Sequence, residues 1–197
     1  MNNDVEKIKK LREKTGAGMM DCKEALSEAK GDIEKAIEFL RKKGIALASK
    51  KSSRAAKEGI IASYIHMNHR VGVLVEVNSE TDFVARNEEF KKFVKEITMQ
   101  IAAACPFYIS RDDVPKEELD KEIEIIKEQN KDKPAQSMDK IIHGRLEKFY
   151  KEYCLLEQPF IKDESIDIKT MLTDLIGKIG ENIVIRRFAR YQLGEEI

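Results

Sequence analysis

A strict alternation of valines sets the first limit on the fold of this chain. Four valines occupy every second position of one short stretch: Val71, Val73, Val75 and Val77. Because the side chains of a β-strand alternate between its two faces, this pattern predicts a strand with one buried face. The apolar segment 59–67 precedes it, and residues 68–70, Asn-His-Arg, have the composition of a turn. We therefore predict a β-hairpin over residues 59–79.

An isolated hairpin is marginally stable, and the rest of the chain offers elements to complete a core. Residues 182–193 are rich in Ile, Val, Phe and Tyr and predict a third strand. Helices are expected from about Ala85 to Ala104, ending before Pro106, and from about Lys169 to Lys178. The first of them has an apolar stripe of Phe90, Phe93, Val94, Ile97 and Ile101. A small three-stranded antiparallel sheet packed by helices belongs to the α+β class.

Two polar segments with helical character lie in the second half of the chain, Lys116–Asn130 and Ala135–Tyr153. The short connection between them ends in Pro134, so we predict that they fold back on each other as a helical hairpin over residues 116–153. A solvated structural arm is the default interpretation of this hairpin. The following segment, Leu155–Ser165, is expected to be irregular.

Residues 4–44 show helical periodicity. Three apolar stripes recur at helical spacing, and glycines separate them. Their members are Val5, Ile8 and Leu11, then Cys22, Ala25, Leu26 and Ala29, and finally Ile33, Ala36, Ile37 and Leu40. Asp32 is placed to cap the third helix, and Gly44 is expected to end it. Residues 1–45 therefore predict a compact three-helix bundle.

Basic residues gather at the end of this bundle. From Arg41 to Lys57 the chain has seven basic residues and no acidic one. We assign residues 46–58 to a basic linker and residues 59–197 to a core α+β domain. The basic residues form either a solvated linker that continues the third helix or a strip that touches an acidic or phosphate-bearing partner. The lack of an interleaved aromatic that could stack on bases favours the linker.

Composition excludes several classes of function. The 36 basic residues balance the 36 acidic ones, so no net field attracts nucleic acid or an anionic membrane. No apolar run approaches the roughly 18 residues of a membrane span, and the N-terminus lacks a signal-peptide pattern. The three cysteines lie far apart without a CxxC motif, which fits a reducing compartment, so we expect a cytoplasmic protein. Without a P-loop, GxGxxG or GxSxG motif, we expect no enzyme, metal site or cofactor.

The segment 78–87, between the second strand and its helix, has two interpretations. Ser79, Thr81 and Asp82 are ordinary helix-capping residues, and Phe83 could fasten the start of the helix to the core. Alternatively, the turn presents an aromatic and a carboxylate to a partner protein. An exposed aromatic can carry much of the binding energy of an interface, and a carboxylate can disturb the ligands of a cation. Spacing alone favours the capping interpretation.

Five segments carry a family resemblance, and they occur in the family's order along nearly the whole chain. They are Leu11–Lys23, Val75–Asn87, Gly144–Tyr150, Leu155–Phe160 and 180–188. Together they resemble the elongation factor Ts family, the exchange factors of elongation factor Tu. The second segment contains the family's signature, Thr-Asp-Phe-Val, at positions 81–84. Five motifs in order are far more specific than any one of them.

This resemblance implies a non-enzymatic guanine nucleotide exchange factor for elongation factor Tu in translation elongation. In the family, the signature loop reaches the partner's nucleotide-binding domain and disturbs its Mg²⁺ site, which carries over to Thr81, Asp82, Phe83 and Val84. The N-terminal bundle, UBA-like in the family, also contacts the partner, and its matching positions are Arg12, Met19 and Met20. Short members can dimerise through the sheet, so a homodimer is also considered. No nucleic acid or membrane partner is expected.

Other interpretations stay open on the residues alone. Met19 and Met20 could belong partly to the core of so small a bundle, and Arg12 could be an ordinary solvated residue. Longer relatives have a second sheet-bearing subdomain, whereas only one three-stranded unit is predicted here. The rival function is an adaptor whose bundle binds ubiquitin-like or peptide partners without nucleotide exchange. A Mg²⁺-dependent enzyme using Glu80 and Asp82 fits less well, because no nucleophile–base pair accompanies them.

Overall fold

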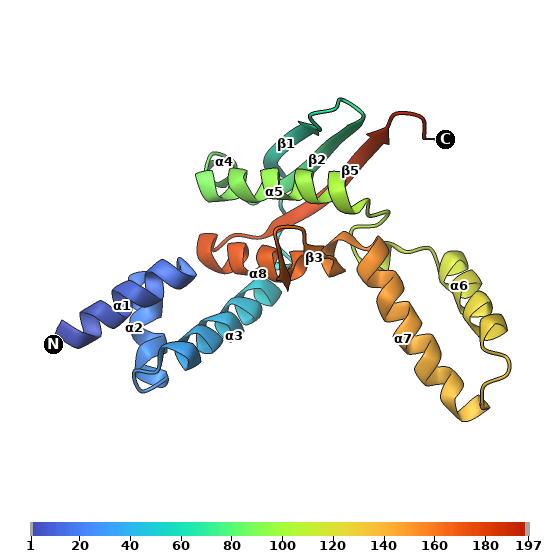
Figure 1. Ribbon diagram of the computed structural model, residues 1–197. Helices are drawn as coiled ribbons and strands as arrows, with labels where there is room; N and C mark the ends of the chain where they lie inside the picture. The colour runs from blue at the N-terminus through green and yellow to red at the C-terminus, as the bar shows by residue number, and fades with distance from the viewer. Residues whose placement is uncertain (1, 196–197) are drawn as a thin grey trace. The chain divides into compact units, whose positions relative to one another are not determined.

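The computed structural model describes residues 2–195 and has the predicted mixture of helices and small antiparallel sheets (Figure 1). The chain is therefore of the α+β class. Its elements in chain order are α1 (Asn2–Thr15), α2 (Met19–Glu28), α3 (Ile33–Lys51), β1 (Glu58–Ile65), β2 (Val71–Ser79), α4 (Asp82–Ala85), α5 (Glu88–Ala104), the 3₁₀ turn η1 (Arg111–Asp113), α6 (Lys116–Gln129), α7 (Ala135–Tyr153), the 3₁₀ turn η2 (Leu155–Glu157), β3 (Pro159–Phe160), β4 (Asp163–Asp167), α8 (Ile168–Ile179) and β5 (Ile183–Gln192).

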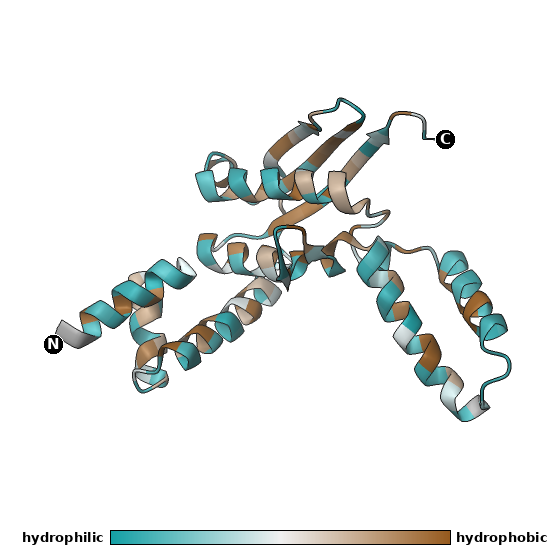
Figure 2. Ribbon diagram, viewed as in Figure 1, coloured by the Kyte–Doolittle hydropathy of each residue, from teal (hydrophilic) through white to brown (hydrophobic). Residues whose placement is uncertain are grey.

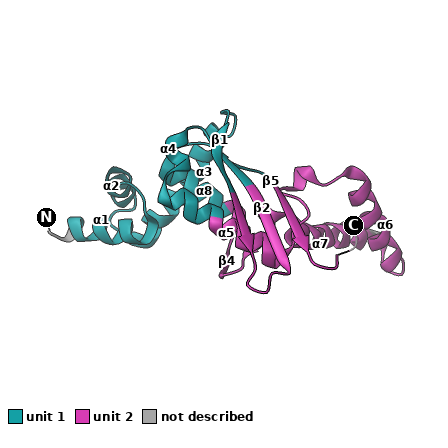
Figure 3. Cartoon of the chain, turned by 90° about the horizontal axis from the view of Figure 1, so that it is seen from above, with its two compact units in different colours: residues 1–61, 76–94, 170–186 teal, residues 62–75, 95–169, 187–197 magenta. Residues whose placement is uncertain are grey.

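These elements form two compact units whose segments alternate along the chain (Figure 3). One unit comprises Met1–Ile61, Glu76–Val94 and Thr170–Arg186, and the other comprises Ala62–Val75, Lys95–Lys169 and Arg187–Ile197. The strands of the main sheet contribute to both units, because each strand is divided between them. The division of the chain at residues 45 and 58 stays a prediction.

The first three helices pack around a small core of their own. This core consists of Leu11, Cys22, Ala25, Leu26 and Ala36, with further apolar residues of the three predicted stripes packed against it. The Asp32 side chain accepts a hydrogen bond from the Lys35 N–H at 3.1 Å, which confirms the predicted cap of α3. Val5 departs from the prediction, because 66% of its surface is exposed on α1.

The predicted end of the third helix at Gly44 is wrong, because α3 continues to Lys51. Glycine inside a helix costs only about 1 kcal/mol relative to alanine, which the neighbouring helical turns offset. The position also has a packing role. A Cβ atom on Gly177 of α8 would lie 3.4 Å from the Gly44 Cα, so the two glycines let these helices approach closely.

The main sheet has the strand order β1-β2-β5, which confirms the predicted hairpin and third strand. In the hairpin turn, the His66 N–H donates to the Val71 carbonyl at 2.9 Å, and His69 adopts a φ of +54°. Leu193, which follows β5, donates to the carbonyl of Arg70, which precedes β2, at 2.8 Å. The end of β5 therefore pairs with the start of β2, as an antiparallel arrangement requires.

The buried faces of β2 and α5 supply most of the core near the sheet. On β2 the predicted alternation is confirmed: Val73, Val75 and Val77 are at most 3% exposed. The predicted stripe of α5 is buried as well, and Figure 1 shows α5 running alongside the strands. Figure 2 shows apolar residues along β2 and β5, whereas on α6 and α7 apolar and polar residues are interspersed.

Helices α6 and α7 form the predicted helical hairpin, but the segment after it is more regular than expected. Residues 155–165 contain η2, β3 and part of β4, and the two short strands pair antiparallel. The buried Gln100 of α5 fixes this segment: its Oε1 accepts from the Ile161 N–H at 2.9 Å, and its Nε2 donates to the Pro159 carbonyl at 3.1 Å. Among residues 2–195, no helix is long and apolar enough to cross a membrane.

Candidate functional site

The segment that follows β2 is a short helical turn with a break after it. A single helix from Ala85 was predicted, but α4 ends at Ala85 and α5 begins at Glu88. The side chain of Asn87 sits at the break, where its Oδ1 accepts hydrogen bonds from the N–H groups of Glu89 at 2.8 Å and Phe90 at 3.3 Å. Asn87 therefore caps α5, and the signature residues 81–84 form a separate turn in front of it.

The aromatic and the carboxylate of this turn face outward. Phe83 is 77% exposed, while its neighbours Val84 and Ala85 are buried. Asp82 is about half exposed, and its Oδ2 lies 2.8 Å from the Arg86 guanidinium. We call Asp82 and Phe83 the tip. The interpretation of Phe83 as a residue that fastens the helix to the core is wrong, because a side chain exposed to this extent has little core contact.

Thr81 does not cap the turn with its side chain. Its Oγ1 donates instead to Glu181 Oε1 at 2.7 Å, and its backbone N–H donates to Glu181 Oε2 at 3.0 Å. The connection is reciprocal, because the Asn182 N–H donates to Glu80 Oε1 at 2.7 Å. We call these three hydrogen bonds, which join Glu80 and Thr81 to Glu181 and Asn182, the base network.

Further contacts hold both sides of the base network. Asn182 is 3% exposed, and its Nδ2 donates to the Arg54 carbonyl at 2.7 Å. Ser79 is fully buried, and its Oγ donates to the Thr81 carbonyl at 2.8 Å. The hydrogen bond from the Asn182 N–H lowers the pKa of Glu80, since it favours the charged carboxylate. Sequence reasoning noted the Gly-Glu-Asn segment but gave its residues no role.

The second group of predicted site residues lies on the N-terminal bundle. Met19 and Met20 are 60% and 73% exposed, so the alternative that they lie partly in the core of the bundle is wrong. Arg12 is also exposed. A shallow, mainly apolar depression between α1 and the start of α2 includes Arg12 and Met19 together with Val5 and Ile8. The tip and this surface belong to the same compact unit.

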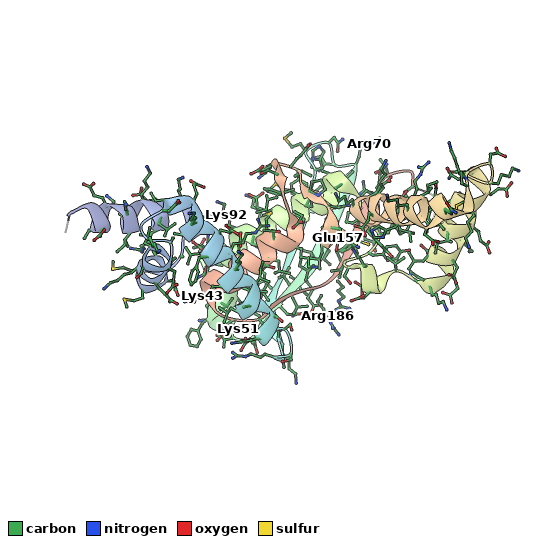
Figure 4. The ribbon with its side chains drawn as sticks, turned by 90° about the horizontal axis from the view of Figure 1, so that it is seen from below. Lys43, Lys51, Arg70, Lys92, Glu157 and Arg186 are labelled. Atoms are coloured by element: carbon green, nitrogen blue, oxygen red, sulfur yellow. The ribbon has the colours of Figure 1, made fainter. Side chains whose placement is uncertain are left out.

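Several basic residues between Arg41 and Lys57 make contacts within the chain. Lys43 Nζ lies 2.9 Å from Asp21 and 2.7 Å from Glu24, and the hydrogen bond to Glu24 is the main cause that raises its pKa. Lys51 donates to the Gly180 carbonyl. Figure 4 shows Lys43 and Lys51 on α3. These contacts favour a structural role over a strip reserved for a phosphate-bearing partner.

Within the described residues, no group of three or more His, Cys, Asp or Glu side chains is arranged to hold a metal ion. Cys22 and Cys154 are buried, and burial raises the pKa of the Cys154 thiol to about 11. A thiol with so high a pKa is a poor nucleophile near neutral pH.

Comparison with known proteins identifies the family. The family model described as "Elongation factor TS" matches residues 1–175. Elongation factor Ts of Caldanaerobacter subterraneus subsp. tengcongensis is 62% identical over 195 residues, covering 98% of each chain. That of Carboxydothermus hydrogenoformans is 61% identical over 190 residues, covering 95% of this chain and 88% of the relative. That of Syntrophus aciditrophicus is 58% identical over 192 residues, covering 96% of each.

The chain has an α+β fold, and Phe83 exposes an aromatic surface of the kind that protein–protein interfaces use. The matches to known proteins extend over nearly the whole chain and identify its family. The chain belongs to the elongation factor Ts family.

Proposed function

We propose that this chain is the guanine nucleotide exchange factor of elongation factor Tu in translation elongation. Membership of the elongation factor Ts family supports this function. The observation that carries the mechanism is the 77% exposure of Phe83 on a turn whose next two residues are buried. A large aromatic held outward next to two buried residues is suited to enter a partner protein. The factor forms and breaks no covalent bond in this role, so it is not an enzyme in the usual sense.

The mechanism is thermodynamic coupling between two ligands of elongation factor Tu. Suppose that the exchange factor binds the nucleotide-free partner more tightly than the GDP complex. The ratio of these two affinities is then also the ratio by which the exchange factor weakens GDP binding. Phe83 supplies contact energy inside the partner, and Asp82 acts near the Mg²⁺ that helps to hold the diphosphate. Burying an aromatic contributes roughly 1.5–3 kcal/mol, or about one to two decades in an equilibrium constant. The contact energy of the tip alone is therefore too small to displace GDP, and a second contact with the partner must supply the remaining binding energy.

The four signature residues divide into two roles in this proposal. Phe83 and Asp82 are exposed enough to meet the partner, whereas Thr81 is bonded to Glu181 and Val84 is 7% exposed. Thr81 and Val84 then act by holding the turn, with the exposed edge of Thr81 at the rim of the contact. The factor needs no preference between GTP and GDP, because their concentrations set the direction of exchange.

We assign the second contact to the N-terminal bundle, which we take to be UBA-like. Met19 and Met20 are exposed on α2, and unbranched methionine side chains adapt readily to a partner surface. Arg12 lies at the edge of the same apolar depression, where it can pair with an acidic group of the partner. The domain division at residues 1–45, 46–58 and 59–197 accompanies this assignment.

A homodimer through the main sheet is a further proposal. On the sheet face opposite Val73, the side chains of Ile65 and Leu74 are 59% and 49% exposed. Exposed apolar groups on one face of a small sheet favour association with a second sheet. Sedimentation at micromolar concentration checks this, since a monomer alone would contradict it. We also propose a cytoplasmic protein with no membrane or nucleic acid partner; the adaptor function is not favoured, because it leaves the family signature unused.

The test of the function is release of fluorescent GDP from purified elongation factor Tu. The full chain is expected to accelerate release, and the variant Asp82→Ala/Phe83→Ala is expected to lose most of the acceleration. Ile125→Ser serves as a matched control, because it alters a 49% exposed apolar residue on α6. No acceleration by the wild type would reject the exchange function. Full acceleration by the double variant would reject only the role of the tip.

A further inference from the structure

We propose that Glu181 is a positioning residue for nucleotide exchange, which it serves by holding the tip in the orientation that enters the partner. This inference rests on the proposed function of the tip. Glu181 lies 100 residues away in sequence from Thr81, yet its carboxylate accepts two hydrogen bonds from that residue. Both of its oxygens are used, one by the Thr81 backbone N–H and the other by the Thr81 hydroxyl.

The geometry of the base network opposes both sliding and twisting of the turn. Two consecutive residues on one side, Glu80 and Thr81, bond two consecutive residues on the other, Glu181 and Asn182. The bonds run in opposite senses, because Glu181 accepts from Thr81 while Glu80 accepts from Asn182. If Thr81 moves away from Glu181, or Glu80 moves away from Asn182, at least one hydrogen bond to a charged carboxylate lengthens. Such hydrogen bonds are stronger than those between neutral groups.

The side that contains Glu181 is itself anchored. Gly180 ends α8 with a φ of +79°, its N–H donates to the Ile176 carbonyl at 2.8 Å, and its own carbonyl accepts from Lys51. Asn182 is buried and bonded to the Arg54 carbonyl. Glu181 therefore lies on a turn that is itself held in place. Its hydrogen bonds to Thr81 restrict the movement of Thr81 relative to that turn.

The buried Val84 and Ala85 hold the turn only on the C-terminal side of the tip, so the other side depends on the bonds to Thr81. Helix α4 has only four residues, and the Asp82 carboxylate is paired with Arg86 of the same turn. Phe83 is largely exposed, so its position depends on the backbone of the turn. A preorganised contact group loses less conformational freedom on binding, and the loss of preorganisation slows insertion of the tip. Docking of the N-terminal bundle is unaffected, so the half-saturating concentration of factor is expected to change little.

The first measurement is tip mobility in the free protein. The chain has no tryptophan, so Phe83→Trp introduces a single indole reporter. Time-resolved fluorescence anisotropy of this variant is expected to show a larger fast component when Glu181→Ala is added. Glu181→Gln is expected to restore the slow behaviour, because an amide can accept from the Thr81 N–H and donate to its hydroxyl. Glu147→Ala is the control: it also removes a carboxylate that makes two hydrogen bonds, here to Arg111 in the other unit.

The second measurement is GDP release from elongation factor Tu at saturating factor. Glu181→Ala removes both hydrogen bonds to Thr81. It is expected to lower the maximal rate by at least about tenfold, because even one hydrogen bond to a charged group corresponds to about that ratio. Glu181→Gln is expected to recover it to within about threefold of wild type, since it regains neutral hydrogen bonds. In the Asp82→Ala/Phe83→Ala background, which lacks both tip side chains, Glu181→Ala is expected to have no further effect, because it acts only through the tip. Circular dichroism and thermal unfolding confirm that each variant is folded.

The outcomes separate this inference from the proposed function. If Glu181→Ala leaves the anisotropy unchanged, Glu181 does not position the tip, whatever the release rate. If the anisotropy changes and Phe83→Ala slows release but Glu181→Ala does not, positioning by Glu181 does not serve exchange, and the inference is overturned. Should Phe83→Ala itself release GDP at the wild-type rate, the tip function fails, and with it the part of the inference that concerns exchange. A slowdown by Glu181→Ala that persists in the Asp82→Ala/Phe83→Ala background would also overturn it.

Discussion

The guanidinium of Arg86 lies 2.8 Å from the carboxylate of Asp82, four residues earlier on the same turn. Both groups are exposed, so the ion pair contributes at most about 1 kcal/mol to stability. Asp82 must leave Arg86 before it can act on a group of the partner. The ion pair therefore competes weakly with the proposed exchange function.

Replacement of Arg86 tests this competition. Arg86→Ala is expected to change the free energy of unfolding by less than about 0.5 kcal/mol. It is expected to raise the rate of GDP release by up to about threefold, because the carboxylate is freed. Stopped-flow release of fluorescent GDP measures the effect, with Arg86→Lys as the control that keeps the charge. A loss of tenfold or more would show that Arg86 itself contacts the partner.

The proposed role of Asp82 predicts a dependence on Mg²⁺. With Mg²⁺ present, Asp82→Ala is expected to slow factor-stimulated GDP release by about tenfold. After removal of the metal with a chelator, the difference from wild type is expected to shrink to about twofold or less, because there is no cation left to disturb. The two release rates are measured side by side at both metal concentrations. An unchanged ratio would assign Asp82 to a contact unrelated to the metal.

The exposed methionines of the bundle predict a separate effect on affinity. Met20→Ser removes an apolar contact worth about 1.5–3 kcal/mol if it is fully buried by the partner. The half-saturating concentration of factor is expected to rise by about tenfold or more, while the maximal release rate is kept. Because Met20 is 73% exposed in the free chain, thermal stability should be unchanged. A lower maximal rate with unchanged half-saturation would contradict a docking role.

The base network predicts a pH dependence of stability. The pKa of Glu80 is lowered below its usual value of 4.5, mainly by the Asn182 N–H, so its charged form is favoured in the folded state. This contribution is fully present above pH 4.5 and is lost as the pH falls through the lowered pKa of the folded protein. The stability difference between wild type and Glu80→Gln should therefore shrink as the pH is lowered from 6 toward about 3. Urea unfolding at several pH values measures it, and a difference that grows toward low pH would contradict the assignment.

Most of the fold follows from local periodicity. The alternation through Val73, Val75 and Val77 identifies β2, and stripes at helical spacing identify α2, α3 and α5. Two helix boundaries were wrong, for different reasons. Gly44 is kept inside α3, next to Gly177 of α8. The break before α5 has a local signal that was overlooked: Asn87 followed by two glutamates is a typical helix start.

Short and long-range features could not be predicted in the same way. Strand β3 has two residues, which are too few to show a period in the sequence. It is held in part by the hydrogen bond from the buried Gln100 to the Pro159 carbonyl. The residues of the tip were found by family resemblance, but the sequence did not reveal whether Phe83 is exposed. The hydrogen bond between Thr81 and Glu181 connects residues that are 100 positions apart in the sequence. Local sequence patterns cannot predict a contact over that separation.

The most direct test concerns Phe83 alone, with the maximal rate of GDP release from elongation factor Tu measured at saturating factor. For Phe83→Ala we predict a fall of about ten- to a hundredfold, from the loss of one buried aromatic contact. Its melting temperature should equal that of the wild type, because the ring is 77% exposed in the free chain. A stable Phe83→Ala variant that releases GDP as fast as the wild type would contradict the account.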